Sequence, residues 1–464
     1  MSAELSLETT AIPGLLVLHL PVHGDNRGWF KENWQRAKMT ALGLPDFGPV
    51  QNNMSFNHAV GTTRGIHAEP WDKLVSSAHG RYFGVWVDLR QGPGFGTVVT
   101  TVVDESVAVF VPRGVGNAYQ TLDPDVAYSY LVNAHWSEAK IPEYAYVNLA
   151  DPTLAIPWPI PLDQAELSDK DKAHPLLADA RRVEPRKTLI LGAHGQLGRA
   201  LAALFPAGVG ADIDTLDLTD PAQVAAWPWG DFGVVLNAAA WTDVDGAETP
   251  EGRVGAWRAN ATVPATLARL ALEHGFTLVH VSSDYVFDGG LSAAVTPGAG
   301  WTEDAPLAPL SVYGQSKAAG DLAVGVVPRH YLLRTSWVVG DGRNFLRTMA
   351  GLAERGVKPS VVSDQVGRLT HTANLAAAIK HLLDVGAPYG TYNCTDGGAP
   401  RSWADIARAV FAAHGRDPDD VTPVTTVAYY AGKDGIAPRP AWSVLDLAKL
   451  EATGYVAPEF PPGE

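Results

Sequence analysis

The sequence predicts two domains: an all-β domain over residues 1–180, followed by an α/β domain with a parallel sheet over residues 186–464. The length of 464 residues is enough for two or three domains, at roughly 100–200 residues per domain. Short β-rich runs separated by Gly, Pro, Asn and Asp fill the first part of the chain. After residue 186 the pattern changes, because apolar strand-like runs there alternate with amphipathic helical runs.

The β-rich runs of the first part lie at residues 15–20, 73–90, 95–103, 106–114 and 126–133. Strands at this spacing are typical of an antiparallel sandwich or barrel. Residues 151–164 are Pro-rich and irregular, and residues 163–186 are polar and charged. We therefore expect the edge of the first domain and a connecting linker in this stretch.

Strand and helix patterns alternate through the second part, at residues 188–205, 233–241, 261–275, 276–287, 311–324, 331–339, 344–356 and 371–386. A parallel sheet needs helical crossovers between its strands, and these crossovers cover both of its faces. The alternation therefore predicts a Rossmann-type, doubly wound parallel sheet.

The composition excludes several classes of function. With 35 Lys and Arg against 50 Asp and Glu, the formal net charge is −15, which argues against a broad nucleic-acid surface. A phosphorylated small molecule is still possible, since it needs only a few local cations or a helix N-terminus. The single cysteine, Cys394, excludes an intrachain disulfide, and we expect it to be a buried apolar residue in a reducing compartment. Without a leader-like N-terminus or an apolar run of membrane length, the sequence predicts a cytoplasmic protein with no membrane partner.

A glycine-rich turn marks a candidate nucleotide site. Gly192, Gly195 and Gly198 follow an apolar strand and open a helix, where a close backbone and free N–H groups can bind a pyrophosphate. Asp212 lies where a carboxylate would accept hydrogen bonds from a ribose diol, and Asp217 is a candidate neighbour of the adenine. A simple tight turn for the glycines, and a cap or turn role for either Asp, are the alternatives.

A second motif supplies acid–base chemistry. Tyr313 and Lys317 are four residues apart, so a helix places them on one face, and a nearby ammonium would lower the pKa of the phenol. The phenol could then pass a proton to an alkoxide formed by hydride transfer. Ser283 ends a strand upstream, where its hydroxyl could donate a hydrogen bond to a substrate carbonyl.

The second part resembles the dTDP-4-dehydrorhamnose reductase family of extended short-chain dehydrogenases, through the motifs LGAHGQLGRAL, LNAAAWTDVDGAE, VSSDYVFDG, PLSVYGQSKAAGD, RTSWVVG and NFLRTM. The resemblance implies a small C-terminal substrate-binding part and reduction of the C4 ketone of a dTDP-4-keto-6-deoxy-L-sugar by NADPH or NADH. It implies that Tyr313 is the acid, Lys317 its activator and Ser283 the carbonyl polariser.

The same resemblance implies contacts to both ligands. The cofactor would contact Gln196, Leu197, Asp217, Leu218, Ala239 and Ala240, and the sugar nucleotide would contact Asp284, Tyr285 and Trp337. Some members bind a metal through glutamates at their dimer interface. The matching position here is Ala200, so we expect no such metal, although a homodimer is expected.

The first part carries a different set of polar residues, spread over several strand-like runs. Two arginines suit a diphosphate, and a histidine can remove a proton made acidic by a neighbouring ketone. The alternation of side chains along strands could bring such residues into the mouth of one barrel. Taken alone, His67 could instead be a structural histidine whose ring nitrogens are hydrogen-bonded inside the barrel. A metal-binding cupin would need a second histidine close by, but Ala68, Glu69 and Pro70 follow.

This first part resembles the dTDP-4-dehydrorhamnose 3,5-epimerase family, a cupin-like jelly roll, over roughly residues 10–180. The resemblance implies that His67, paired with Asp171, removes the protons at C3 and C5 of the keto sugar. It also implies that Tyr130 is the acid and that Lys73 stabilises the enolate. The positions that match binding residues are Arg27, Glu32, Gln51, Asn53, Arg64, Glu143 and Lys170.

Two departures from the family pattern concern the pocket. Asn117 replaces the usual histidine of its segment, and the loop between His67 and Lys73 is shorter than usual. Neither removes the expected base, its carboxylate or the acid, so we expect an active epimerase with Asn117 as a substrate-binding residue.

The two resemblances together predict a bifunctional enzyme of dTDP-L-rhamnose synthesis. It would invert C3 and C5 of dTDP-4-dehydro-6-deoxy-D-glucose and then reduce C4. Three alternatives are a reductase with a non-catalytic N-terminal module, an enzyme that makes another dTDP-6-deoxy sugar, and a regulator that senses the dinucleotide without turnover.

Overall fold

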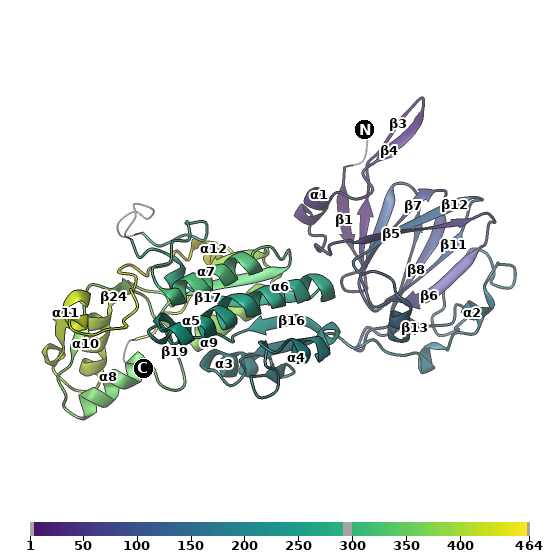
Figure 1. Ribbon diagram of the computed structural model, residues 1–464. Helices are drawn as coiled ribbons and strands as arrows, with labels where there is room; N and C mark the ends of the chain where they lie inside the picture. The colour runs from purple at the N-terminus through teal and green to yellow at the C-terminus, as the bar shows by residue number, and fades with distance from the viewer. Residues whose placement is uncertain (1–3, 291–298, 462–464) are drawn as a thin grey trace. The chain divides into compact units, whose positions relative to one another are not determined.

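The structure is a computed structural model that describes residues 4–290 and 299–461 (Figure 1). The chain divides into two compact units, Met1–Pro185 and Arg186–Glu464. The first is built from antiparallel strands and the second from a parallel sheet with helices. The predicted order of an all-β part followed by an α/β part is therefore confirmed.

Two antiparallel sheets form the first unit, with the strand orders β1-β2-β10-β7-β12-β5 and β13-β6-β11-β8-β9. The strands of the first sheet are β1 (Ser6–Thr9), β2 (Leu16–His19), β5 (Gln51–Asn57), β7 (Lys73–His79), β10 (Val107–Val111) and β12 (Val126–Val132). Those of the second are β6 (Thr63–Ala68), β8 (Tyr82–Asp88), β9 (Val98–Val103), β11 (Val115–Thr121) and β13 (Ala145–Tyr146). The hairpin of β3 (Val22–Asp25) and β4 (Gly28–Lys31) extends away from both sheets (Figure 1).

Side chains from both sheets meet in a core that contains Trp86, Tyr82 and Val75. Because residues alternate between the two faces of a strand, side chains on the other faces form two further buried clusters, one with Met39 of α1 and one with Leu154 and Val183. Only two short α-helices accompany these sheets in the described part of the unit, α1 (Arg36–Ala41) and α2 (Asp169–Lys172).

The stretch expected to hold a linker packs largely against the first unit. Helix α2 lies in it and contacts β6, and Val183 is buried beside Arg90 through an isolated bridge. Residues 163–186 are therefore mostly polar, but their few apolar side chains pack against the second sheet of the first unit.

A six-stranded parallel sheet with the order β15-β14-β16-β17-β18-β23 forms the centre of the second unit. Its strands are β14 (Lys187–Leu191), β15 (Val209–Ala211), β16 (Phe232–Asn237), β17 (Thr277–Ser283), β18 (His330–Thr335) and β23 (Gly390–Asn393). The strand order reverses direction at β14, so a crevice opens beyond the carboxyl ends of the strands there.

Helices cover both faces of this sheet (Figure 1). One face packs against α4 (Pro221–Ala226), α6 (Val263–His274) and α7 (Val312–Val324), and the other against α3 (Gln196–Leu204), α9 (Thr372–Asp384) and α12 (Ala448–Glu451). Helix α5 (Pro250–Trp257) runs into α6 through a π-helical turn at Arg258–Thr262. Cys394 is fully buried on the second face.

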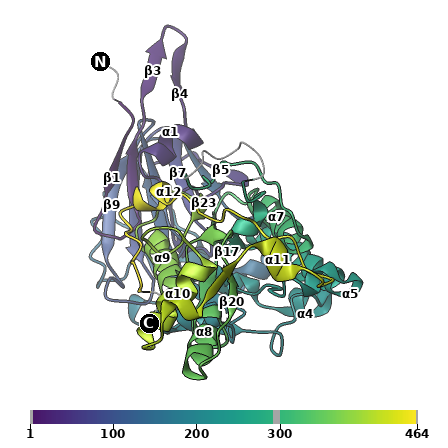
Figure 2. The ribbon, with the colours of Figure 1, turned by 90° about the vertical axis from the view of Figure 1, so that its left-hand side faces the viewer.

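A smaller lobe with its own core completes the second unit. It contains α8 (Phe345–Glu354), α10 (Trp403–Ala413) and α11 (Thr426–Tyr430), which lie together in Figures 1 and 2. Three two-stranded sheets accompany these helices, formed by β19 (Val338–Val339) with β22 (Thr370–His371), β20 (Ser360–Val362) with β25 (Thr422–Val424), and β21 (Val366–Gly367) with β24 (Arg401–Ser402). Among the helices of the described residues, none is both long and apolar enough to cross a membrane.

Candidate active sites

A cleft of about 1130 Å³ opens at the carboxyl ends of β14, β16 and β17 in the second unit. Most residues predicted for this half line it: Gly192, Gly195, Gln196, Leu197, Asp212, Asp217, Leu218, Ala239, Ala240, Ser283, Asp284, Tyr285, Tyr313, Lys317 and Trp337. Gly198 lies beneath the turn, in the first turn of α3. The sheet thus gathers these residues from segments that are far apart in the sequence.

Close backbone packing explains the glycines of the turn. Gly192 has a φ of 73°, and a Cβ there would lie 2.7 Å from the backbone nitrogen of Ala239. A Cβ on Gly198 would lie 2.1 Å from the carbonyl oxygen of Gly192. Gly195 is the N-cap of α3, and no side chain among the described residues caps that helix. The free N–H groups at its start therefore fit the pyrophosphate of a dinucleotide.

The two predicted carboxylates face this cleft but also hold the local backbone. Asp212 Oδ2 accepts a 2.8 Å hydrogen bond from the backbone nitrogen of His194, and Oδ1 accepts one from Ile213. Asp217 Oδ1 accepts hydrogen bonds from the backbone and hydroxyl of Thr219. A carboxylate has about four acceptor positions, so each keeps capacity for a ligand hydroxyl or amine.

Tyr313 and Lys317 lie on the face of α7 that packs against β17. Tyr313 hydrogen bonds with the side chain of Ser283, and Lys317 Nζ donates to the carbonyl oxygen of Val281 at 2.6 Å. The expected lowering of the phenol pKa is wrong, because burial raises the pKa of Tyr313 to about 12 and outweighs the hydrogen bond from Ser283. Burial also lowers the pKa of Lys317 to about 8. Tyr313 is thus a protonated phenol at neutral pH.

The other predicted residues of this half also line the cleft. Asp284 is buried and hydrogen bonds with Ser283 and Ser443, and burial raises its pKa to about 6. The ring of Tyr285 meets that of Tyr313 edge-on at 5.4 Å. Trp337 has a φ of 46°, a region that non-glycine residues rarely adopt and that often marks functional sites.

In the first unit, β6 and α2 bring a histidine and a carboxylate together. His67 Nε2 lies 2.9 Å from Asp171 Oδ1. The side chain of His67 is 32% exposed and that of Asp171 only 7%, so the pair is open to solvent on the histidine side. Burial raises the pKa of Asp171, but hydrogen bonds from His67 and Ser168 outweigh it and lower the pKa on balance.

Lys73 lies on β7 beside the predicted acid. Its Nζ is 2.7 Å from Glu69 Oε2 and 5.5 Å from the centre of the Tyr130 ring. Burial, helped by the charge of Glu69, raises the pKa of Tyr130 to about 12. The phenol is therefore protonated at neutral pH, as an acid must be before it acts.

Family comparisons match each unit separately. The family model described as RmlD substrate binding domain matches residues 186–462, and the one described as dTDP-4-dehydrorhamnose 3,5-epimerase matches residues 9–179. The "Protein RmlC homolog" of Streptococcus pyogenes is 52% identical over 184 residues, which cover 39% of this chain and 92% of that protein. The chain belongs to both families. The predicted fusion of an epimerase part with a reductase part is therefore confirmed.

Three further proteins match the reductase part. A probable dTDP-4,6-dihydroxy-2-methyloxan-3-one 4-ketoreductase of Streptomyces antibioticus is 40% identical over 276 residues, covering 57% of this chain and 88% of that protein. A dTDP-4-dehydrorhamnose reductase of Mycobacterium tuberculosis is 39% identical over 277 residues, covering 58% and 87%. The crystal structure of a Bacillus anthracis dTDP-4-dehydrorhamnose reductase in complex with NADP is 32% identical, covers 60% of this chain and 96% of that one, and has a TM-score of 0.53.

The remaining residues predicted for the epimerase part fall into two groups. Gln51 donates to Asn53 Oδ1, Asn53 hydrogen bonds with Tyr130, and Asn117 lies opposite His67 in the β6–β11 register and donates to the Tyr128 hydroxyl. Arg64 donates to Asn57, and Lys170 lies over the ring of Tyr146. Within the described residues, by contrast, Arg27 pairs with Asp25 in the exposed hairpin, Glu32 with Lys38 and Glu143 with Lys140, so these three form ion pairs with sequence neighbours and not with His67 or Asp171.

Three residues that the sequence did not single out also belong to these sites. Glu69 pairs with Lys73, and Trp403 stacks on Trp337 with ring centres 3.8 Å apart. His174 Nε2 lies 3.2 Å from Asp171 Oδ1. The Asp-x-x-His spacing of Asp171 and His174 was visible in the sequence, but only the fold places both beside His67, 104 residues earlier than Asp171.

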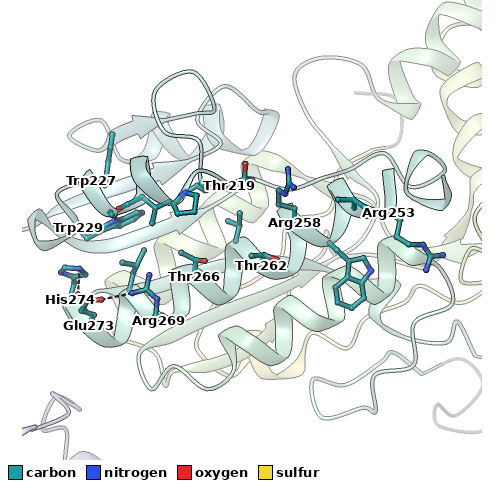
Figure 3. Close-up of a pocket in the computed structure, with 18 residues that line it drawn as sticks. Thr219, Trp227, Trp229, Arg253, Arg258, Thr262, Thr266, Arg269, Glu273 and His274 are labelled. Carbon is teal, nitrogen blue, oxygen red and sulfur yellow. Dashed lines mark hydrogen bonds and ion pairs between the residues drawn. The ribbon is translucent and has the colours of Figure 1, made fainter. Parts of the chain in front are cut away.

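A separate groove of about 830 Å³ runs between α4 and α6 of the reductase part (Figure 3). Its lining includes Arg253, Arg258 and Arg269, and Arg269 pairs with Glu273 at 3.1 Å. Of the predicted residues, only Leu218 reaches it. We therefore assign the reductase chemistry to the larger cleft, where the acid–base residues lie.

Proposed function

We propose that the chain converts dTDP-4-dehydro-6-deoxy-D-glucose to dTDP-L-rhamnose, by epimerisation at C3 and C5 followed by NAD(P)H-dependent reduction at C4. Membership of both families makes the chain a bifunctional isomerase and oxidoreductase of the dTDP-L-rhamnose pathway. The observation that carries the proposal is the presence, in one chain, of the His67–Asp171 pair and of the Ser283, Tyr313 and Lys317 set.

For epimerisation, His67 is the base. Because its Nε2 faces the Asp171 carboxylate, the neutral ring carries its proton on Nε2 and keeps a lone pair on Nδ1. This lone pair can remove a proton from the carbon next to the C4 ketone. Asp171 then stabilises the imidazolium that forms, as carboxylates do behind catalytic histidines.

The enolate oxygen and the return of the proton need two further groups. Lys73 is the buried cation at this site, and a cation beside an oxyanion stabilises its charge. Tyr130 is protonated and lies next to Lys73, so it can return a proton on the other face of the ring. Asn117 keeps one donor and one acceptor where the family has histidine, so the expected loss is about one hydrogen bond, on the order of 0.5–1.5 kcal/mol.

For reduction, the glycine turn and the start of α3 would hold the pyrophosphate of NADPH or NADH, which supplies the hydride when bound. The NADP complex of the Bacillus anthracis relative supports this cofactor class. Ser283 would donate a hydrogen bond to the C4 oxygen, and Tyr313 would give its proton to the alkoxide. The Lys317 ammonium would stabilise the phenolate that Tyr313 leaves behind.

Two finer features of the protein belong to the same proposal. The two antiparallel sheets and the inner core of the first unit support a cupin-like jelly roll. We also expect a homodimer, which sedimentation at micromolar concentration would test.

The product decides between the proposal and its main alternative. Incubation of the chain with dTDP-4-dehydro-6-deoxy-D-glucose and NADPH should give dTDP-L-rhamnose, identified by NMR. The Streptomyces antibioticus ketoreductase relative supports the alternative that another dTDP-6-deoxy sugar is made. A product that retains the configuration of the substrate at C3 or C5 would contradict the proposal and favour this alternative.

A further inference from the structure

His174 gives the epimerase site a second histidine on the same carboxylate. His67 Nε2 and His174 Nε2 lie 2.9 Å and 3.2 Å from the same atom, Asp171 Oδ1. One ligand atom from each of these three residues can be chosen so that all lie within 4.8 Å of one another. Around a tetrahedral zinc ion, with bonds of 2.0–2.2 Å, neighbouring ligand atoms are about 3.3 Å apart. The three side chains are therefore already arranged much as a metal site requires.

The environment of His174 points to a ligand. Its side chain is only 7% exposed, and within the described residues its Nε2 forms no regular hydrogen bond although it faces Asp171. A buried nitrogen without a regular partner is uncommon, because its desolvation is then uncompensated. The ring stacks on Tyr146 at 4.6 Å, and Tyr146 lies opposite His67 in the β6–β13 register, so the orientation of His174 is fixed.

We propose that His67, Asp171 and His174 form a binding site for a divalent transition-metal ion of the zinc class, and that an ion bound there stops proton removal by His67. Two imidazoles and a carboxylate are a ligand set that such ions prefer. The exposed side of His67 leaves room for water as a further ligand. We propose an inhibitory ion at this site, not a metal that takes part in catalysis.

The inhibition follows from the tautomer of His67. A metal on Nε2 displaces the proton that Asp171 holds there, and the neutral ring must then carry its proton on Nδ1. That nitrogen is the one whose lone pair is needed to remove the substrate proton. This half of the inference rests on the proposed epimerase function, whereas the metal site itself does not.

Metal binding is measured first, without any turnover. Full-length protein is titrated with CoCl₂ in a non-chelating buffer, and the visible absorption of bound Co²⁺ is recorded. The wild type should show one site per chain that ZnCl₂ displaces. His174→Gln should weaken it at least about tenfold, since a direct ligand is lost. His174→Phe, which retains an aromatic ring for stacking on Tyr146, should weaken it equally.

His58→Gln is the matched control, because His58 pairs with Asp125 at 3.0 Å on the exposed surface of the same unit, and that pair is not part of the three-residue cluster. This variant should bind Co²⁺ as the wild type does. No binding by the wild type, or binding by both His174 variants as tight as that of the wild type, would overturn the site. The thermal unfolding of each variant without metal, compared with that of the wild type, reports whether its first unit is intact.

Inhibition is measured second, as deuterium exchange at C3 and C5 in D₂O with and without ZnCl₂. Each variant is normalised to its own rate without metal. Zinc should stop exchange by the wild type reversibly, with EDTA restoring it, and the His174 variants should need at least about tenfold more zinc. Exchange that zinc leaves unchanged in a protein that binds Co²⁺ would overturn the inhibitory role. Co²⁺ binding without any exchange in untreated protein would leave the site standing and contradict the proposed epimerase function.

Discussion

At the scale of single residues, burial sets the protonation of the groups proposed to act. It raises the pKa of both Tyr130 and Tyr313 to about 12, so both phenols hold their protons at neutral pH. It has the opposite effect on Lys317, because burial disfavours the charged form of any group. Both tyrosines are therefore poised as acids, and the charge of the lysine changes at about pH 8.

Lys317 should set an upper pH limit for reductase activity. Its lowered pKa of about 8 means that the ammonium is present below that pH and is lost as the pH rises through it. Without the ammonium, the Tyr313 phenolate is less stable, so kcat/KM for a pre-epimerised substrate at saturating NADPH should fall above about pH 8. Lys317→Arg should move this limit upward, since the guanidinium stays charged. An unchanged limit in that variant would assign it to another group.

Asp212 should allow NADH as a cofactor. Its carboxylate faces the cleft after β15, where it can accept hydrogen bonds from a free 2′-hydroxyl and would repel a 2′-phosphate. Asp212→Ser should therefore shift the ratio of kcat/KM values toward NADPH by about tenfold or more, since one charged contact is exchanged for a neutral one. Epimerase exchange is the control for folding. A ratio that does not move would show that Asp212 only holds the turn.

At the scale of elements, a catalytic pair could be predicted from the sequence only where both of its residues lie on one element. The four-residue spacing of Tyr313 and Lys317 lies on a helix, so their proximity could be predicted from the sequence alone. The pairing of His67 with Asp171 needed a resemblance, because it joins a strand to the four-residue helix α2. The only local signal for α2 was the Ser-x-x-Asp spacing of its N-cap Ser168 and Asp171, since the helix is short, charged and in a stretch expected to be a linker. Glu69, His174 and Trp403 became visible only through tertiary contacts.

The β14–α3 turn should tolerate no side chain at Gly198. A Cβ there would lie 2.1 Å from the Gly192 carbonyl oxygen and 2.7 Å from the Ala193 Cα, so the backbone would have to move. Gly198→Ala should therefore abolish measurable NADPH binding and reduction while epimerase exchange continues. Gly230→Ala is the matched control, because a Cβ at Gly230 meets nothing within 4 Å. Normal NADPH affinity in Gly198→Ala would contradict the tight packing of the turn.

At the scale of the whole molecule, the two units have separate cores and separate sites. The buried clusters of Met1–Pro185 share no residue with those of Arg186–Glu464. Two domains and their fold classes could be predicted from the change of pattern near residue 186. Joining the two activities in one chain fixes the ratio of epimerase to reductase sites. It also raises the effective concentration of the reductase site near newly formed epimerase product.

Separate sites predict that two inactive variants complement each other. His67→Asn should lose epimerisation by about 10²–10⁴-fold, as expected for a lost general base, and Tyr313→Phe should lose reduction to a similar extent. An equimolar mixture of the two should form dTDP-L-rhamnose, because the intermediate can diffuse from one chain to the other. NADPH oxidation measures this directly. A mixture as inactive as either variant alone would mean that the sites depend on each other within a chain.

The central claim, that both halves act on one sugar, is tested most directly in D₂O. The full-length chain is incubated there with dTDP-4-dehydro-6-deoxy-D-glucose and NADPH, and the product is analysed by NMR. Proton removal by His67 and return of solvent deuterium predict dTDP-L-rhamnose with deuterium at C3 and C5 and with hydrogen from NADPH at C4. A reduced product that keeps hydrogen at both C3 and C5 would show that only the reductase is active and would contradict the account.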